Sequence, residues 1–202
     1  MPNWCENNLS ITGNKEELDR LVEYVKGEDE SFSFHAILPI PKELQGTQSP
    51  ANIVTQKEYD NIPPELWAKM IDPNNPFESI PITTKMSKIY IMEYGNDNWY
   101  DWSCDNWGTK WDTRHVEMQR SSPTELSYFF DTAWSPPEGI YKELVNQFPT
   151  LRFTLQWSEE GGEFGTIRDT DDIPERETTR AMHARIEALL TNMSEKGKFK
   201  YA

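Results

Sequence analysis

Residues 125–158, ELSYFFDTAWSPPEGIYKELVNQFPTLRFTLQWS, contain the signals of a strand, a helix and a second strand. The first ten residues are rich in aromatic side chains with high β propensity, which favours a strand over 125–134. Ser135 and Glu138 then form a capping-box pattern, and apolar side chains recur at helical spacing over 136–148. LRFTLQWS alternates strictly between apolar and polar residues, so we expect another strand over 151–158.

A similar unit opens the chain. WCENNLSITG alternates and ends at a glycine, which predicts a strand over residues 4–12. Asn14 and Glu17 form a second capping box before apolar positions at helical spacing, so a helix is expected over 14–26. SFSFHAILP alternates again and predicts a strand over 32–38.

Two strand–helix–strand units predict an α+β fold, the ferredoxin-like split βαβ sandwich, with one antiparallel sheet and two helices on one face. Prolines interrupt every periodic pattern from residue 39 to 124, so this stretch is interpreted as a long insertion between strands 2 and 3, with a short helix near 64–71. After the fourth strand, EFGTIRD predicts one further strand. The domain is expected to span residues 1–170.

Residues 171–202 are expected to form a separate element, an amphipathic helix followed by a basic tail. The apolar stripe of this helix consists of Met182, Ile186, Leu189, Leu190 and Met193. We expect the stripe to pack on the domain or on a second copy of it, because a long exposed apolar stripe favours aggregation.

The composition points to a cytoplasmic protein with a protein partner. The formal net charge of −14 argues against nucleic-acid binding, which depends on Lys and Arg, and it favours a basic protein partner. No apolar run is long enough to span a membrane, and MPNWCENN lacks the features of a signal peptide. In the cytoplasm Cys5 and Cys104 are expected to remain thiols.

Four tryptophans lie within thirteen residues, at positions 99, 102, 107 and 111. They either pack in the core or form a surface that grips a partner, since tryptophan serves both purposes. We expect at least one of Trp107 and Trp111 to pack in the core. The candidate partner-binding residues are Trp107, Lys110, Trp111, Asp112 and Trp134.

The sequence contains none of the common catalytic motifs. Cys5, His35, Cys104 and His115 lack the spacing of zinc ligands, and EEGGEFG has the composition of a hairpin turn. We therefore expect no catalytic residue, no metal and no cofactor. The chain is interpreted as a non-enzymatic binding protein. The alternative is an enzyme or a binder of a nucleotide-like ligand, with its site between the sheet and the Trp-rich insertion.

Four motifs occur in the order MPNWCENNLSITG, NWGTKWD, FDTAWSPP and EEGGEFG. Together they resemble the phage and plasmid proteins typified by YubB, over most of residues 1–170. The resemblance implies a ferredoxin-like domain and an origin in a mobile element, and it identifies no catalytic residue. The C-terminal helix lies outside it.

Overall fold

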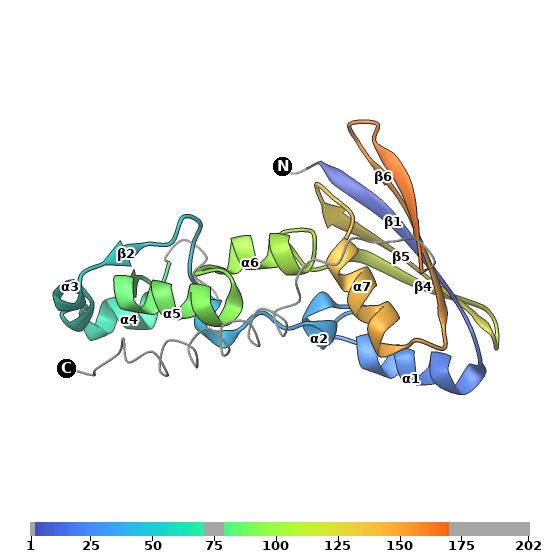
Figure 1. Ribbon diagram of the computed structural model, residues 1–202, viewed down its shortest axis with the longest axis horizontal. Coiled ribbons are helices and arrows are strands. Elements are labelled where there is room, and N and C mark those ends of the chain that lie inside the picture. The colour runs from blue at the N-terminus through green and yellow to red at the C-terminus, as the bar shows by residue number, and fades with distance from the viewer. Residues whose placement is uncertain (1–2, 71–78, 170–202) are drawn as a thin grey trace, which may run out of the picture. The chain divides into compact units, whose positions relative to one another are not determined.

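The computed structural model describes residues 3–70 and 79–169 (Figure 1). The chain divides into two compact units. The first, called the sheet unit below, comprises the described residues 3–41 and 100–169. The second, called the helical unit, comprises the described residues 42–70 and 79–99.

The sheet unit is built on a five-stranded antiparallel sheet with the strand order β4-β5-β1-β6-β7. Its strands are β1 (Trp4–Thr12), β4 (Arg114–Ser122), β5 (Glu125–Ala133), β6 (Arg152–Glu159) and β7 (Phe164–Arg168). Helix α1 (Lys15–Val25) follows β1, and helix α7 (Glu138–Gln147) joins β5 to β6. This connectivity is the split βαβ arrangement, so the predicted fold class is confirmed. β7 is the further strand that EFGTIRD predicts.

Both helices lie on the same face of the sheet (Figure 1). The strands turn alternate side chains toward them, and the buried members include Leu9, Ile11, Leu126, Phe130, Phe153 and Leu155. Helix α7 is tied to β6 by the Tyr141 hydroxyl, which donates a 2.9 Å hydrogen bond to the Phe153 carbonyl. The Tyr24 ring of α1 meets the Phe148 ring beyond α7 edge to face, at 5.4 Å between centroids. The opposite face of the sheet carries the part-exposed and exposed residues.

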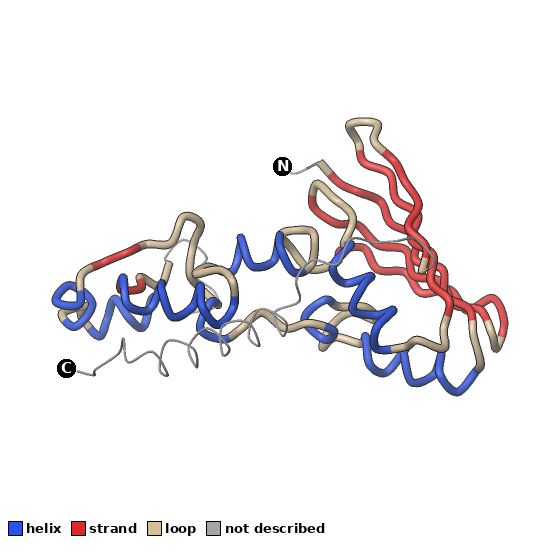
Figure 2. Tube along the Cα trace, in the orientation of Figure 1, coloured by secondary structure: helices blue, strands red, loops and turns tan. Residues whose placement is uncertain are grey.

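The predicted strand over 32–38 is wrong: this stretch contains the short helix α2 (Phe34–Ile37), and Figure 2 shows helix and loop there. Phe32, Phe34 and Ile37 are all buried, so the alternation reflects burial and not strand pairing. The Asp112 carboxylate accepts hydrogen bonds from the Phe34 and His35 amides, which satisfies backbone donors that a strand would offer to a neighbour. A partner this distant in sequence cannot be inferred from local periodicity.

The second strand of the sheet is β4, which lies inside the predicted insertion. It forms one edge of the sheet, and almost all of its side chains are exposed, so it lacks the apolar alternation of a half-buried strand. The long excursion of the chain therefore lies between α1 and the second strand, instead of between the second and third strands.

The helical unit falls within this excursion. It contains a 3₁₀ turn (Lys42–Leu44), the short parallel pair β2 (Ile53–Val54) and β3 (Ile82–Thr83), and three helices. These are α3 (Gln56–Asp60), α4 (Pro64–Met70) and α5 (Thr84–Tyr94). α4 confirms the short helix expected near 64–71 as far as residue 70. Leu44 and Ile82 are buried and form part of the core of this unit.

Residues 170–202 lie outside the described part of the chain, so the predicted C-terminal helix and its apolar stripe remain predictions. Among the helices that the structure describes, none is long and apolar enough to cross a membrane.

Candidate binding site at one end of the sheet

Trp107 is a core residue of the sheet unit. It is 1% exposed, and its indole Nε1 donates a 2.8 Å hydrogen bond to the Leu38 carbonyl. The rings of Phe34, His35 and Trp102 surround it at 5.7, 4.9 and 6.0 Å between centroids. The expectation that at least one of Trp107 and Trp111 packs in the core is confirmed. Trp107 is not available at the surface for a partner.

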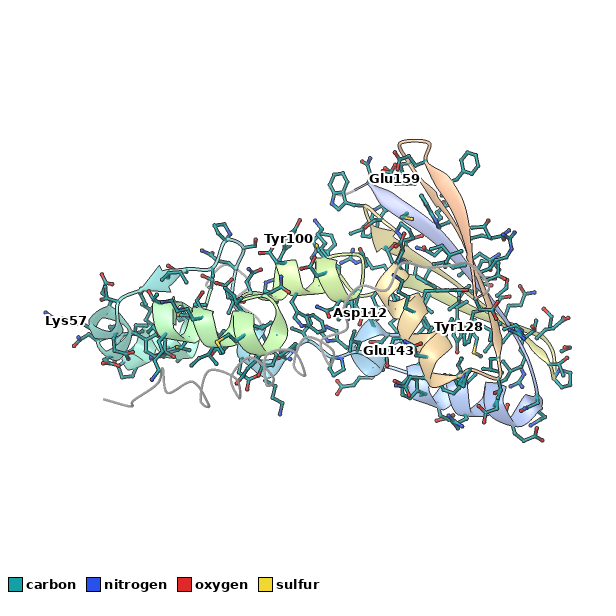
Figure 3. All side chains as sticks on the ribbon, in the orientation of Figure 1. Lys57, Tyr100, Asp112, Tyr128, Glu143 and Glu159 are labelled. Atoms are coloured by element: carbon teal, nitrogen blue, oxygen red, sulfur yellow. The ribbon has the colours of Figure 1, made fainter. Side chains whose placement is uncertain are left out.

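Asp112 also has a structural role (Figure 3). Its carboxylate accepts hydrogen bonds from the Ser33 hydroxyl at 2.7 Å, the Phe34 amide at 2.6 Å and the Thr113 amide at 2.7 Å. Because both carboxylate oxygens are engaged, Asp112 holds the start of α2 against residues 112–113. Its contacts are internal, although the sequence suggested a surface that faces a partner.

Lys110, Trp111 and Trp134 do lie together at the surface. Trp111 is 37% exposed and Trp134 is 51% exposed. The Lys110 ammonium lies 3.9 Å from the centroid of the Trp111 ring and 5.8 Å from that of Trp134, both within the range of cation–π attraction. The structure thus brings together three of the five predicted site residues.

Two residues that the sequence analysis did not select complete this group. The Trp4 ring lies 6.4 Å from the Trp111 ring, and the Arg114 guanidinium lies 5.6 Å from the centroid of Trp4. We call Trp4, Lys110, Trp111, Arg114 and Trp134 the tryptophan–cation cluster. Trp4 could have been found from the sequence, because alternation in WCENNLSITG places it on the sheet face opposite the buried Cys5.

Three adjacent strands position the cluster at one end of the sheet. Trp4 begins β1 and pairs with Ala133, the last residue of β5. Arg114 begins β4 and pairs with Asp131 of β5. Trp134 follows β5 directly, and its amide donates a 3.0 Å hydrogen bond to the Asn3 carbonyl.

The backbone at this end of the sheet is strained. In the described residues, His115 and Trp134 are the non-glycine residues with positive φ, at 51° and 76°. His115 lies at a register shift in β4, where its Nδ1 atom is 2.8 Å from the Asp131 carboxylate. A left-handed conformation costs a non-glycine residue roughly 1–2 kcal/mol, and such strain concentrates at functional sites.

Hydroxyl groups lock the turn that carries Trp134. The Thr109 hydroxyl donates to the Ala133 carbonyl at 2.8 Å, and the Thr132 hydroxyl donates to the Ser135 carbonyl at 2.8 Å. The Ser135 hydroxyl donates to the Gly108 carbonyl at 2.6 Å. These bonds fix residues 132–135 against residues 108–109, so the exposed Trp134 side chain is carried by a rigid backbone.

The electrostatic setting of the cluster is mixed. Within the described chain, neither Lys110 nor Arg114 forms an ion pair with a carboxylate. The sheet unit is nevertheless acidic, since its described residues include 20 Asp and Glu against nine Lys and Arg. Glu6 is exposed on the same sheet face as Trp4 and stands directly opposite Asp131.

The two cysteines are both free, and neither is activated. Burial raises the pKa of the Cys5 thiol to about 11. Burial also raises the pKa of Cys104, and the nearby carboxylates of Asp101 and Asp105 add to the effect. Because the thiolate is the reactive form, the raised pKa lowers the reactivity of both thiols at neutral pH. Over residues 3–70 and 79–169, no group of three or more His, Cys, Asp or Glu could hold a metal ion.

Part of the sequence matches a known family model. Residues 106–189 match the family model for the ferredoxin-like domain in Api92-like protein. The sheet unit is accordingly a ferredoxin-like domain, by its strand order and by this match. The match begins next to Trp107 and includes Lys110, Trp111, Arg114 and Trp134.

A crystal structure of the protein Api92 from Yersinia pseudotuberculosis is also similar to the chain. The similarity covers 82% of this chain and 93% of that one, at 14% sequence identity and a TM-score of 0.45. No curated protein matches the chain in sequence. The resemblance to YubB-type proteins of phages and plasmids stays a prediction.

Proposed function

We propose that the chain is a non-enzymatic binding protein that engages a protein partner through the tryptophan–cation cluster. The observation that carries this proposal is the exposure of Trp111 and Trp134 on a rigid turn, with Lys110 on their rings. Tryptophan is enriched among the residues that dominate the affinity of protein interfaces, because one side chain buries a large apolar area at little entropic cost.

The alternative, an enzyme or a binder of a nucleotide-like ligand, has less support. It requires Trp107, Trp111 and Trp134 to line one pocket on which acidic side chains converge. Trp107 instead packs against Phe34 and Trp102, and Asp112 is engaged by backbone amides. The raised pKa values of Cys5 and Cys104 also argue against thiol chemistry.

The charge of the sheet unit supports a basic partner. An acidic surface accelerates encounter with a cationic protein and repels nucleic acid. We also propose that the protein acts in the cytoplasm and derives from a mobile element. These two statements rest on the sequence motifs and on the free cysteines.

Affinity capture from cell extract tests the proposal. The full chain with Trp111→Ala and Trp134→Ala is compared with wild type and with Met92→Ala, which removes a side chain of similar exposure (45%) from the helical unit. We expect the double variant to lose the captured partner, and wild type and Met92→Ala to retain it. Circular dichroism must show that all three proteins are folded. Undiminished capture by a folded double variant contradicts the proposal.

A further inference from the structure

The exposed indoles of the cluster already hold a cation. The Lys110 ammonium is 3.9 Å from the centroid of the Trp111 ring and 5.8 Å from that of the Trp134 ring, so both rings lie within cation–π range of one positive charge. Proteins use the same attraction to bind ammonium groups of ligands. Here the occupant belongs to the chain itself.

Lys110 is held on these rings without an ion pair to any carboxylate that the structure describes. Its charge also acts on the neighbouring Cys104 thiol. A lysine side chain regains much rotamer freedom when it leaves a fixed position, which offsets part of the lost cation–π attraction. Another cation can therefore displace it.

The surroundings favour a cation over an anion as the incoming group. The exposed Glu6 carboxylate stands opposite Asp131 on the same sheet face, and like charges directly opposite each other repel. The Glu6 carboxylate forms no ion pair with another described residue and accepts no hydrogen bond from one. A positively charged segment would relieve this repulsion, whereas an acidic segment would increase it. Two neighbours oppose the effect in part, since Arg114 pairs in register with Asp131 and the His115 Nδ1 atom lies 2.8 Å from the Asp131 carboxylate.

We propose that Trp111 and Trp134 form a cation-binding cage that Lys110 occupies in the free protein, and that a Lys or Arg side chain of a basic partner takes its place. The inference rests on the proposed function, because it names the chemistry of the partner at the same surface. Lys110 then lowers the affinity of the site that it fills. Its removal should tighten binding, which is opposite in sign to the loss expected of an ordinary contact residue.

The test uses a labelled hexalysine peptide, the full chain and fluorescence anisotropy. Lys110→Met shortens the unbranched side chain by one atom and removes its charge, and Lys26→Met removes one exposed charge from the sheet unit outside the cluster. We expect Lys110→Met to bind hexalysine roughly two- to fivefold more tightly than Lys26→Met, the scale of an exposed cation–π contact. Adding Trp111→Ala and Trp134→Ala to Lys110→Met should abolish this gain.

Equal or weaker binding of hexalysine by Lys110→Met overturns the cage. The cage is also overturned if a hexaglutamate peptide binds wild type but not Lys110→Met, because Lys110 would then belong to an anion-binding site. These results are independent of the capture experiment. If capture needs the tryptophans but Lys110→Met gives no gain, the proposed function stands and the cage is refuted. If the gain is seen but capture does not depend on the tryptophans, the two rings bind a cation, but the captured partner is not its source and the proposed function is refuted.

Discussion

Trp107 and Trp111 are four residues apart in one motif and have different roles. Trp107 is buried among aromatic rings and its indole nitrogen is hydrogen-bonded, whereas Trp111 is 37% exposed under a lysine. The spacing alone could not separate these roles, because residues four apart share a face in a strand and nearly so in a helix. The difference arises from Gly108 (φ 91°), whose left-handed conformation redirects the chain between the two residues.

Substitution of the two tryptophans should therefore have unequal effects on stability. Trp107→Ala should lower the free energy of unfolding by about 3–5 kcal/mol, the range for truncating a large buried aromatic side chain. Trp111→Ala should cost about 1 kcal/mol or less, because its ring is already in contact with water. Denaturant unfolding of both variants measures the difference. Equal losses would show that Trp111 also belongs to the core.

Cys5 should make the stability of the protein depend on pH in the alkaline range. Burial raises the pKa of its thiol from 9.0 to about 11, so the folded state binds this proton more tightly than the unfolded state does. The stabilisation is complete below pH 9.0 and is lost as the pH rises toward 11. The measurement is urea unfolding at pH 8 and pH 10.5, with Cys5→Ala as the control. Wild type should lose more stability than Cys5→Ala between these pH values, and an equal loss would contradict the assignment.

At the level of elements, the sequence predicts those strands that have one buried face and one face turned toward solvent. β1, β5 and β6 alternate in sequence because one face of each packs on α1 and α7. β4 escapes prediction because an edge strand with exposed side chains has no such pattern. α2 is mistaken for a strand because its amides are satisfied by Asp112, about 78 positions away in the sequence.

Gly139, at the start of α7, gives a test of how closely this helix packs against residues 106–107. A Cβ atom on Gly139 would lie 1.9 Å from the Asn106 carbonyl oxygen and 2.7 Å from its carbonyl carbon. Since these are backbone atoms, Gly139→Ala should destabilise the protein by about 1–3 kcal/mol, the usual cost of overpacking.

Helix propensity alone predicts the opposite sign for this substitution, a gain of up to about 1 kcal/mol. Thermal unfolding of Gly139→Ala beside Glu138→Ala, an exposed neighbour in the same turn, distinguishes the two. An unchanged or higher melting temperature for Gly139→Ala would mean that α7 does not approach residues 106–107 this closely.

At the level of the whole molecule, the sequence predicts the fold class and three residues of the surface cluster, and it misses how the cluster is assembled. Trp4 and Arg114 join Lys110, Trp111 and Trp134 only because β1, β4 and β5 are neighbours in the sheet. The net charge of −14 is visible in the sequence, but the placement of two cations on the indole rings is not. The exposure of Trp111 and Trp134 at this end of an acidic sheet unit is the basis of the proposed partner binding.

The most direct test of this account is the affinity of the purified chain for the partner obtained by capture, measured by calorimetry for wild type and for Trp111→Ala with Trp134→Ala. We predict a loss of at least about thirtyfold, since residues that dominate an interface cost about 2 kcal/mol or more when truncated. A folded double variant that binds within about twofold of wild type would contradict the claim that the tryptophan–cation cluster is the binding surface.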